Sequence, residues 1–130
     1  RAIRYADVLL MAAEAFNRSG NDVKARTYLN LVRRRAFGDN NHDISASGAA
    51  LTDFILAERR YEFIGEGHRF FDLVRWGIAK ESLDQYFLIE KGRKPYLQSA
   101  HFTKNKHEYL PIPNLQINLS GGLYVQNPGY

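Results

Sequence analysis

Two glutamates, Glu58 and Glu62, lie four residues apart in a stretch rich in arginines and aromatic residues, ILAERRYEFIGEGHRFFDLVRWG, residues 55–77. Carboxyls about 5–10 Å apart across a cleft are the acid/base pair of glycosidases, and one helical turn could provide that spacing. The surrounding arginines would instead lower the pKa of both carboxyls, so that neither donates a proton near neutral pH. Glycosidase chemistry is therefore the less favoured interpretation.

A structural role for the same charges is favoured. Leu51, Phe54 and Ile55 define one face of a predicted helix, and Glu58 and Glu62 continue that face. A carboxylate left unpaired on an inward face costs several kcal/mol, whereas the forked donors of arginine satisfy it. We expect a clasp between helices, in which the candidate partners are Arg59, Arg69 and Arg75.

Two amphipathic helices open the chain. The first spans about residues 3–18, and the second follows a stop at Gly20 and a cap at Asn21 or Asp22. A short turn makes residues 1–37 a helix hairpin of tetratricopeptide-like appearance. The expected buried residues are Tyr5, Val8, Leu9, Ala12 and Phe16, opposite Asp7 and Glu14, and then Ala25, Tyr28, Leu29, Val32 and Ala36, with Arg26, Asn30, Arg33 and Arg34 facing away.

Residues 49–90 are predicted to form three more helices, over about 49–64, 68–76 and 79–90, after a polar loop. Phe70, Leu73 and Val74 form the apolar stripe of the middle one. Its other side carries Arg69, Asp72 and Trp76, where an Arg–Asp pair would stack on the indole. The apolar side of the last helix is Leu83, Tyr86 and Phe87.

The chain changes character beyond Lys91. All four prolines lie there, and the segment Glu108-Tyr-Leu-Pro-Ile-Pro cannot be helical through its prolines. We interpret residues 91–130 as an extended, loop-rich wrap over the helices. The fold class is therefore mainly α, with residues 1–130 as a single domain.

Composition excludes several functions. The chain has no cysteine, which excludes disulfides, thiolate metal sites and a cysteine nucleophile. Its four histidines lack the spacing of a metal site, and no cofactor motif is present. A net charge of +4 comes from scattered side chains, which argues against nucleic acid. No apolar run reaches the ~20 residues that span a bilayer. The chain starts without Met or a signal peptide, so we interpret it as a fragment of a longer protein.

Aromatic residues in or beside the irregular segment are candidates for ligand contact, because an exposed ring can stack on a sugar or contact a partner. Packing is the ordinary role of such rings. Tyr96 follows Lys94-Pro95 in a polar loop and is the one most expected to be exposed. The candidate ligand-binding residues are Tyr96, Tyr86 and Phe102.

Three segments resemble the C-terminal part of the SusD/RagB family of Bacteroidetes. RYADVLLMAAEAF, residues 4–16, is similar to that family's R-Y-A-D-V-L-L helix. Residues 58–77 resemble its E-R-R-x-E-F-x-x-E-G-x-R-x-x-D-L-x-R-W signature, and KHEYLPIPN with the final QNPGY resembles its closing segments. The resemblance assigns a structural clasp role to Glu58, Arg59, Glu62, Glu66, Gly67, Arg69, Asp72, Arg75 and Trp76.

The resemblance implies a function that the residues alone do not. Members are outer-membrane, surface-exposed lipoproteins that bind glycans, or in some cases peptides, without being enzymes. They deliver the ligand to a SusC-like TonB-dependent transporter and are anchored by an acylated cysteine, which is absent here. The alternative is a helical protein–protein interaction module without a small-ligand site, suggested by the helix hairpin alone.

Overall fold

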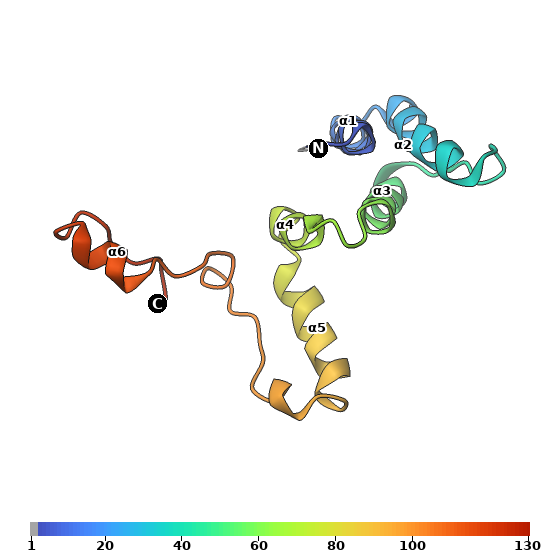
Figure 1. Cartoon of the computed structure of the whole chain (residues 1–130). Coiled ribbons are helices and arrows are strands. Elements are labelled where there is room, and N and C mark those ends of the chain that lie inside the picture. The colour runs from blue at the N-terminus through green and yellow to red at the C-terminus, as the bar shows by residue number, and fades with distance from the viewer. Residues whose placement is uncertain (1–2) are drawn as a thin grey trace. The chain divides into compact units, whose positions relative to one another are not determined.

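A computed structural model describes residues 3–130 of the chain. Among these residues helices are the regular secondary structure and no strand occurs, which confirms the mainly α fold class. None of the described helices is long and apolar enough to cross a membrane. The chain divides into two compact units, Arg1–Arg69 and Phe70–Tyr130, and the one-domain expectation stays a prediction. The elements in Figure 1 are α1 (Tyr5–Arg18), α2 (Asp22–Phe37), α3 (Gly48–Glu62), α4 (His68–Arg75), α5 (Ala79–Lys91), the 3₁₀ helix η1 (Pro95–Leu97) and α6 (Asn114–Leu119).

α1 and α2 form the predicted hairpin, with ends within two residues of the expected positions. Gly20 makes the turn with a φ of +82°, which glycine adopts without strain. The Asn21 side chain caps α2 by accepting a hydrogen bond from the Lys24 backbone N–H at 3.1 Å. Gly38 ends α2 with a φ of +81° and donates its N–H to the Arg34 carbonyl at 2.8 Å.

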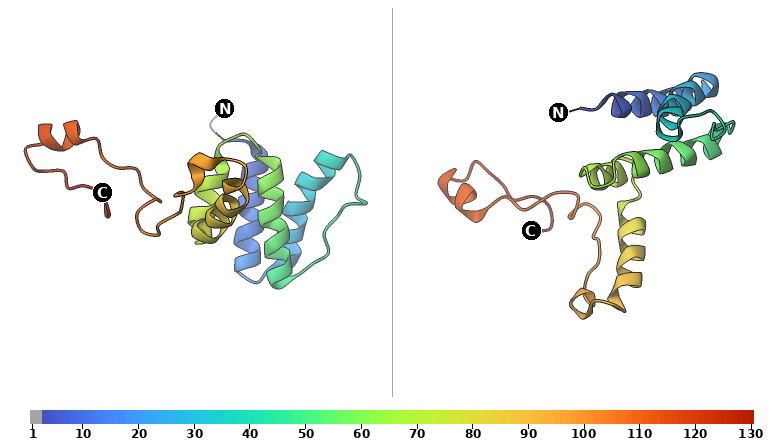
Figure 2. Two further views of the ribbon diagram at one scale, coloured as in Figure 1. Left: turned by 90° about the horizontal axis from the view of Figure 1, so that it is seen from below. Right: turned by 45° about the vertical axis from the view of Figure 1, so that its right-hand side comes forward.

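The loop of residues 38–47 determines the direction of α3. It runs back along α2: the Asn30 amide donates to the Ile44 carbonyl at 3.1 Å and accepts from the Ile44 N–H at 2.9 Å. At its end the Gly48 N–H donates to Asp22 at 2.7 Å. Because the chain has returned to the start of α2, α3 runs parallel to α2 and antiparallel to α1. Figure 2 shows these three helices side by side in blue, cyan and green.

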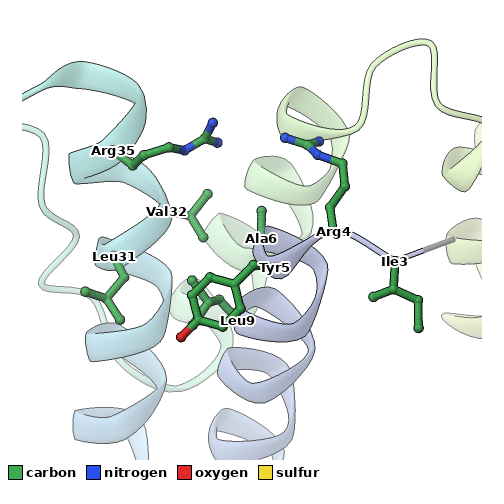
Figure 3. Close-up of a pocket in the computed structure, with 8 residues that line it drawn as sticks. All are labelled: Ile3, Arg4, Tyr5, Ala6, Leu9, Leu31, Val32 and Arg35. Atoms are coloured by element: carbon green, nitrogen blue, oxygen red, sulfur yellow. The ribbon is translucent and has the colours of Figure 1, made fainter. Parts of the chain in front are cut away.

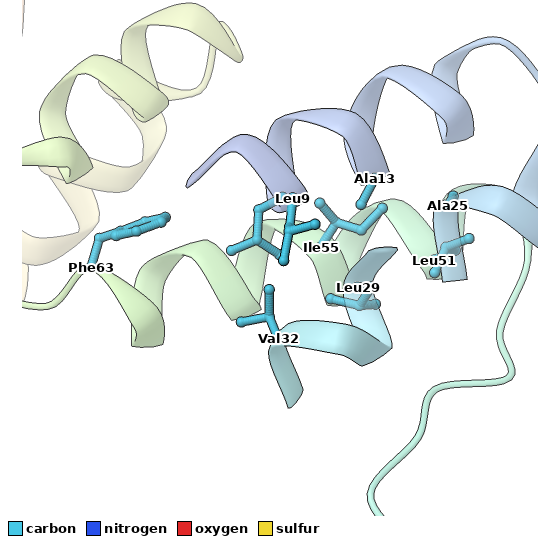
Figure 4. Packing of buried hydrophobic residues seen from close by; sticks show 9 residues of the cluster. Leu9, Ala13, Ala25, Leu29, Val32, Leu51, Ile55 and Phe63 are labelled. Carbon is cyan, nitrogen blue, oxygen red and sulfur yellow. The ribbon is translucent and has the colours of Figure 1, made fainter. Parts of the chain in front are cut away.

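The core of unit 1 lies where α1, α2 and α3 meet (Figure 4). Leu10, Ala13, Ala25, Leu29 and Ile55 are fully buried. The two alanines allow the α1 and α2 backbones to approach closely. The predicted burial is confirmed for Leu9, Ala25, Leu29, Val32, Leu51 and Ile55.

The predicted buried face of α1 is wrong at two of its positions and in its opposite side. Tyr5 is 75% exposed and Val8 is also exposed, whereas Asp7 and Glu14 are buried. α1 carries apolar residues around most of its circumference, so periodicity alone did not select the correct face. The two carboxylates turn inward because they have cationic partners, Arg59 for Asp7 at 2.7 Å and Arg18 for Glu14 at 2.8 Å.

Smaller corrections apply to α2 and α3. Ala36 near the end of α2 and Phe54 on α3 are exposed, although both were expected to be buried. Asn30 was expected to face away and is buried, because its amide satisfies the backbone of the returning loop. Arg33 is also turned inward, toward α3.

Unit 2 has a much smaller core. Leu73, Ala79 and Phe102 are its buried apolar cluster, against which Val74 and Leu83 pack. Asp84 on α5 fastens the following loop, because it accepts the Phe102 N–H at 2.7 Å and the Lys80 ammonium at 2.6 Å. Both hydrogen bonds lower the pKa of Asp84, and the one from Lys80 has the larger effect.

Residues 91–130 are loop-rich as expected, but α6 and η1 were not predicted. α6 begins directly after Pro113. Proline suits the start of a helix because the first N–H groups of a helix have no partner within it, so no hydrogen bond is lost. No residue of α6 is buried. Gln126 holds the flanking segments together, since its amide accepts the Ile112 N–H at 2.8 Å and donates to the Ile112 carbonyl at 2.9 Å.

Candidate functional site

The two glutamates of α3 are both engaged by arginines. Glu58 is buried, and its Oε2 lies 2.5 Å from Arg33 Nη1. The Glu62 carboxylate binds two guanidinium groups, Arg4 at 2.6 Å and Arg35. Arg4 bonds Glu66 Oε1 as well, at 2.5 Å, in the turn made by Gly65 and Gly67. Ion pairs therefore join the end of α3 to both helices of the hairpin.

The arginines that bind Glu58 and Glu62 differ from those expected from the sequence. Arg59, Arg69 and Arg75 were the candidates, but the arginines that bind the two glutamates come from the end of α2 and the residue before α1. The antiparallel hairpin and the parallel α3 bring these three helix ends together. The signal was present in the sequence as the triplet Arg33-Arg34-Arg35, which periodicity placed mainly toward solvent. Each of its members makes an ion pair.

Arg59 has a different role from the expected one. Its side chain is 4% exposed and its Nη1 lies 2.7 Å from Asp7 Oδ1. The guanidinium also lies over the Phe63 ring, 5.1 Å from the centroid. A charge this deeply buried is tolerated only when paired, so Arg59 and Asp7 connect α3 to α1.

In unit 2 the signature residues form a smaller arrangement. Asp72 is buried and Arg75 Nη2 lies 3.2 Å from its Oδ1. The Arg75 guanidinium lies 5.3 Å from the centroid of the Trp76 ring. The predicted Arg–Asp pair on the indole is present, since Arg75 pairs with Asp72 and its guanidinium lies by the Trp76 ring.

A groove of about 440 Å³ lies between α1 and α2 (Figure 3). Its walls are mainly apolar, and the guanidinium groups of Arg4 and Arg35 face each other at one end. Both groups already bind Glu62, so they are partly neutralised for any further anion. The lining residues are Ile3, Arg4, Tyr5, Ala6, Leu9, Leu31, Val32 and Arg35.

The exposed tyrosines of the predicted ligand set lie in unit 2. Tyr96 in η1 is 78% exposed, as expected, and Tyr86 on α5 is 48% exposed. Lys94 lies near both: its pKa is raised mainly by the hydrogen bond to Glu90, and also by the Tyr86 and Tyr96 phenols. Lys94 Nζ is 2.9 Å from Glu90 Oε2, and the interaction lowers the pKa of Glu90. A role of the two tyrosines in ligand binding stays a prediction.

Phe102 is a correction to that ligand set. It is 4% exposed and forms part of the unit 2 core. Its ring makes edge contacts with Phe70 and His107, with centroids 6.4 Å and 5.7 Å apart. The hydrogen bond from its N–H to Asp84 holds it in place. A ring enclosed in this way has no face left for a sugar, so packing is its role.

The histidines make local contacts. His42 stacks on Phe37, and His68 lies tilted beside Phe63 with ring centroids 4.8 Å apart. His101 and His107 have ring centroids 5.9 Å apart. Among the described residues no group of three or more potential metal ligands comes together.

The fold and these contacts define a helical protein in which a tetratricopeptide-like hairpin is joined by ion pairs to a third helix. Comparison with known proteins is more specific, since the profile of the SusD family matches residues 1–130. The chain belongs to the SusD family. The expected family membership is thereby confirmed.

Individual relatives agree with this assignment. SusD-like protein P25 of Formosa agariphila is 36% identical over 124 residues, and SusD-like protein P2 of the same organism is 33% identical over 135. Surface glycan-binding protein A from Bacteroides thetaiotaomicron matches 98% of the chain with a TM-score of 0.72 and 34% identity. The chain spans 21%, 25% and 24% of these proteins.

Proposed function

We propose that this chain is part of a cell-surface protein that binds oligo- or polysaccharides without cleaving them. The observation that carries the proposal is the match to a surface glycan-binding protein, at 34% identity over 98% of the chain, together with the SusD family profile. Family members of this type are binding proteins. The protein would hold a glycan at the surface and deliver it to a SusC-like TonB-dependent transporter in the outer membrane.

The environment of the α3 glutamates supports binding rather than hydrolysis. A retaining or inverting glycosidase needs one carboxyl free to donate a proton to the leaving group. Glu58 is buried against Arg33, and Glu62 is shared by Arg4 and Arg35. Both carboxylates are therefore engaged in ion pairs that join helices. We assign these residues to stability.

Tyr86 and Tyr96 are the residues of this chain that we propose for sugar contact. Both rings are exposed, and polar groups of Glu90 and Lys94 lie beside them. A ring face offers apolar area to the C–H groups of a sugar, while the neighbouring groups hydrogen-bond its hydroxyls. In a protein as long as these relatives, residues outside this chain would supply further contacts to the sugar.

Membrane attachment through an acylated cysteine, expected from the family, is part of the same proposal. Such a residue would have to lie outside these 130 residues, which contain no cysteine. Lipid anchoring holds a protein at a membrane without a spanning helix.

One observation favours the alternative, a helical protein-interaction module. The groove between α1 and α2 is mainly apolar and open to solvent. The Tyr5 and Leu31 side chains that line it are exposed. Exposed apolar surface of this kind marks contact sites between helices or proteins. The module would bind a partner there and show no affinity for glycans.

Native affinity electrophoresis of the protein in its natural length tests the proposal. Gels contain a panel of soluble polysaccharides, and each is assayed for released reducing ends. We expect retardation by at least one glycan without release. Release of reducing ends would show an enzyme, and the absence of retardation by every glycan, combined with capture of a protein partner by α1 and α2, would favour the interaction module.

A further inference from the structure

The end of α5 and the start of η1 form a corner with an unusual combination of groups, Tyr86, Glu90, Arg93, Lys94 and Tyr96. The tyrosine rings are exposed, while Glu90 is buried. Two cations share the single carboxylate: Lys94 Nζ lies 2.9 Å from Glu90 Oε2 and Arg93 Nη1 lies 3.3 Å from Glu90 Oε1. The corner is therefore an aromatic surface beside a partly neutralised cationic cluster.

The backbone of this corner is well defined by hydrogen bonds. The N–H groups of Arg93 and Lys94 both donate to the Glu90 carbonyl, at 2.9 and 2.8 Å. The Leu97 N–H donates to the Lys94 carbonyl at 3.0 Å, and the Gln98 amide donates to the Lys91 carbonyl at 3.0 Å. η1 is thereby held against the end of α5, so the backbone that carries Arg93, Lys94 and Tyr96 is ordered before any ligand arrives.

The charges of the corner do not balance. Arg93 and Lys94 supply two positive charges, and Glu90 supplies one negative charge between them. The end of a helix contributes about half a negative charge more. An excess of about half a positive charge remains, and the Arg93 side chain that carries part of it is 75% exposed.

We propose that this corner binds an acidic sugar, one that carries a carboxylate or a sulfate ester. The proposal rests on the proposed glycan-binding function and narrows it to anionic polysaccharides. The sugar ring stacks on Tyr96, and its anionic group accepts hydrogen bonds from the guanidinium of Arg93 and the ammonium of Lys94. Charge-assisted bonds of this type are stronger than those that a neutral hydroxyl makes.

Paired polysaccharides of similar backbone and different charge test the proposal. Affinity electrophoresis of the natural-length protein compares polygalacturonate with highly methyl-esterified pectin, and κ-carrageenan with agarose. We expect retardation by polygalacturonate or κ-carrageenan and at least tenfold weaker binding to its neutral counterpart; which acid is bound distinguishes a carboxylate from a sulfate ligand. Equal or stronger binding to the neutral member overturns the anionic assignment and leaves glycan binding intact. If the protein binds none of these four polysaccharides but does bind other neutral glycans, the anionic assignment is also overturned while glycan binding stands.

Variants of the corner link the binding to these side chains. Arg93→Gln and Tyr96→Ala should each weaken binding of the acidic glycan about tenfold. Arg60→Gln and Tyr61→Ala are the matched controls, because both are exposed on α3 and should leave binding unchanged. Unchanged binding in Arg93→Gln and Tyr96→Ala, with intact helical circular dichroism, overturns the proposal.

Added salt and a polyphosphate probe separate a site from simple charge attraction. Binding of the acidic glycan should weaken between low and physiological ionic strength, since exposed charges are screened over about 8 Å at 0.15 M. Tyr96→Ala should not change polyphosphate binding, because a polyphosphate has no ring to stack. Polyphosphate binding as strong as that of the acidic glycan, with the same loss in Tyr96→Ala, would overturn the sugar assignment.

Discussion

Unit 1 and residues 70–130 differ in how their charged and apolar side chains are used. Among the described residues of unit 1, nine buried apolar residues form one cluster where three helices meet, and ion pairs join the ends of those helices. In residues 70–130 the corresponding cluster has three buried residues, and large apolar side chains such as Leu110, Leu123 and Val125 are more than three-quarters exposed.

This difference teaches where stability and recognition lie in the chain. Burial of apolar area is the main source of folding free energy, so unit 1 holds most of what this chain can supply by itself. The exposed aromatic corner of α5 and η1 belongs to the unit with the smaller core. Substitutions in unit 1 should therefore change the free energy of unfolding, whereas substitutions at the corner should change binding alone.

The largest effect is expected from Arg59→Met, which leaves Asp7 unpaired in the interior. Removing one partner of a buried ion pair costs about 3–5 kcal/mol, because the remaining charge stays desolvated. Urea denaturation followed by circular dichroism measures the change. The matched control is Arg34→Gln, whose pair with Asp43 is exposed, and it should have little effect. If the two variants are equally stable, the buried pair does not stabilise unit 1.

The double variant Asp7→Leu/Arg59→Met sharpens this comparison. It removes both charges, and replacement of a buried pair by apolar residues is often neutral. The double variant should recover part of the stability that Arg59→Met loses. A double variant less stable than the single one would show that the pair contributes more than mutual neutralisation.

A somewhat smaller loss is expected from Leu29→Ala, which opens a cavity in the unit 1 core. Leu29 is fully buried between α1, α2 and α3, and such truncations cost about 2–5 kcal/mol. Leu115→Ala on α6 is the control from the other unit, since Leu115 is 65% exposed and should change little. Thermal unfolding of both variants gives the comparison. An equal loss in Leu115→Ala would mean that α6 is buried in solution.

The smallest effect is expected from acid at Asp84, which holds the loop of Phe102 to α5. Its pKa is lowered by Lys80 and the Phe102 N–H, so the carboxylate stabilises the fold above the pKa of an unfolded aspartate and loses that contribution as pH falls below about 4. The Phe102 amide resonance should shift with this transition in an NMR titration. Asp84→Asn should remove the transition; its persistence would assign it to another carboxyl.

Much of the local structure followed from residues close in sequence. Gly20, Asn21 and Gly38 punctuate the hairpin, and their capping and turn roles depend on neighbours within four residues. The helix bounds of α1 to α5 were therefore predictable to within two residues. α6 was missed because its six residues lie in a segment whose prolines dominated the interpretation.

The candidate corner was predictable in part. Tyr96 was recognisable because a polar, proline-containing context disfavours burial, and it is exposed. Phe102 also lies in a polar segment but is buried, because Asp84 eighteen residues earlier binds its N–H. No local pattern contains that contact.

The sequence by itself determined the helices, their order, the need for paired charges around Glu58 and Glu62, and the family to which the chain belongs. These follow from spacing, capping and signature motifs. The tertiary structure alone decided which face of α1 turns inward and which arginines satisfy the glutamates, namely Arg33, Arg4 and Arg35. The physical reason is that a helix with apolar residues on most sides has several possible buried faces. Long-range ion pairs, made when the returning loop sets the direction of α3, select one of them.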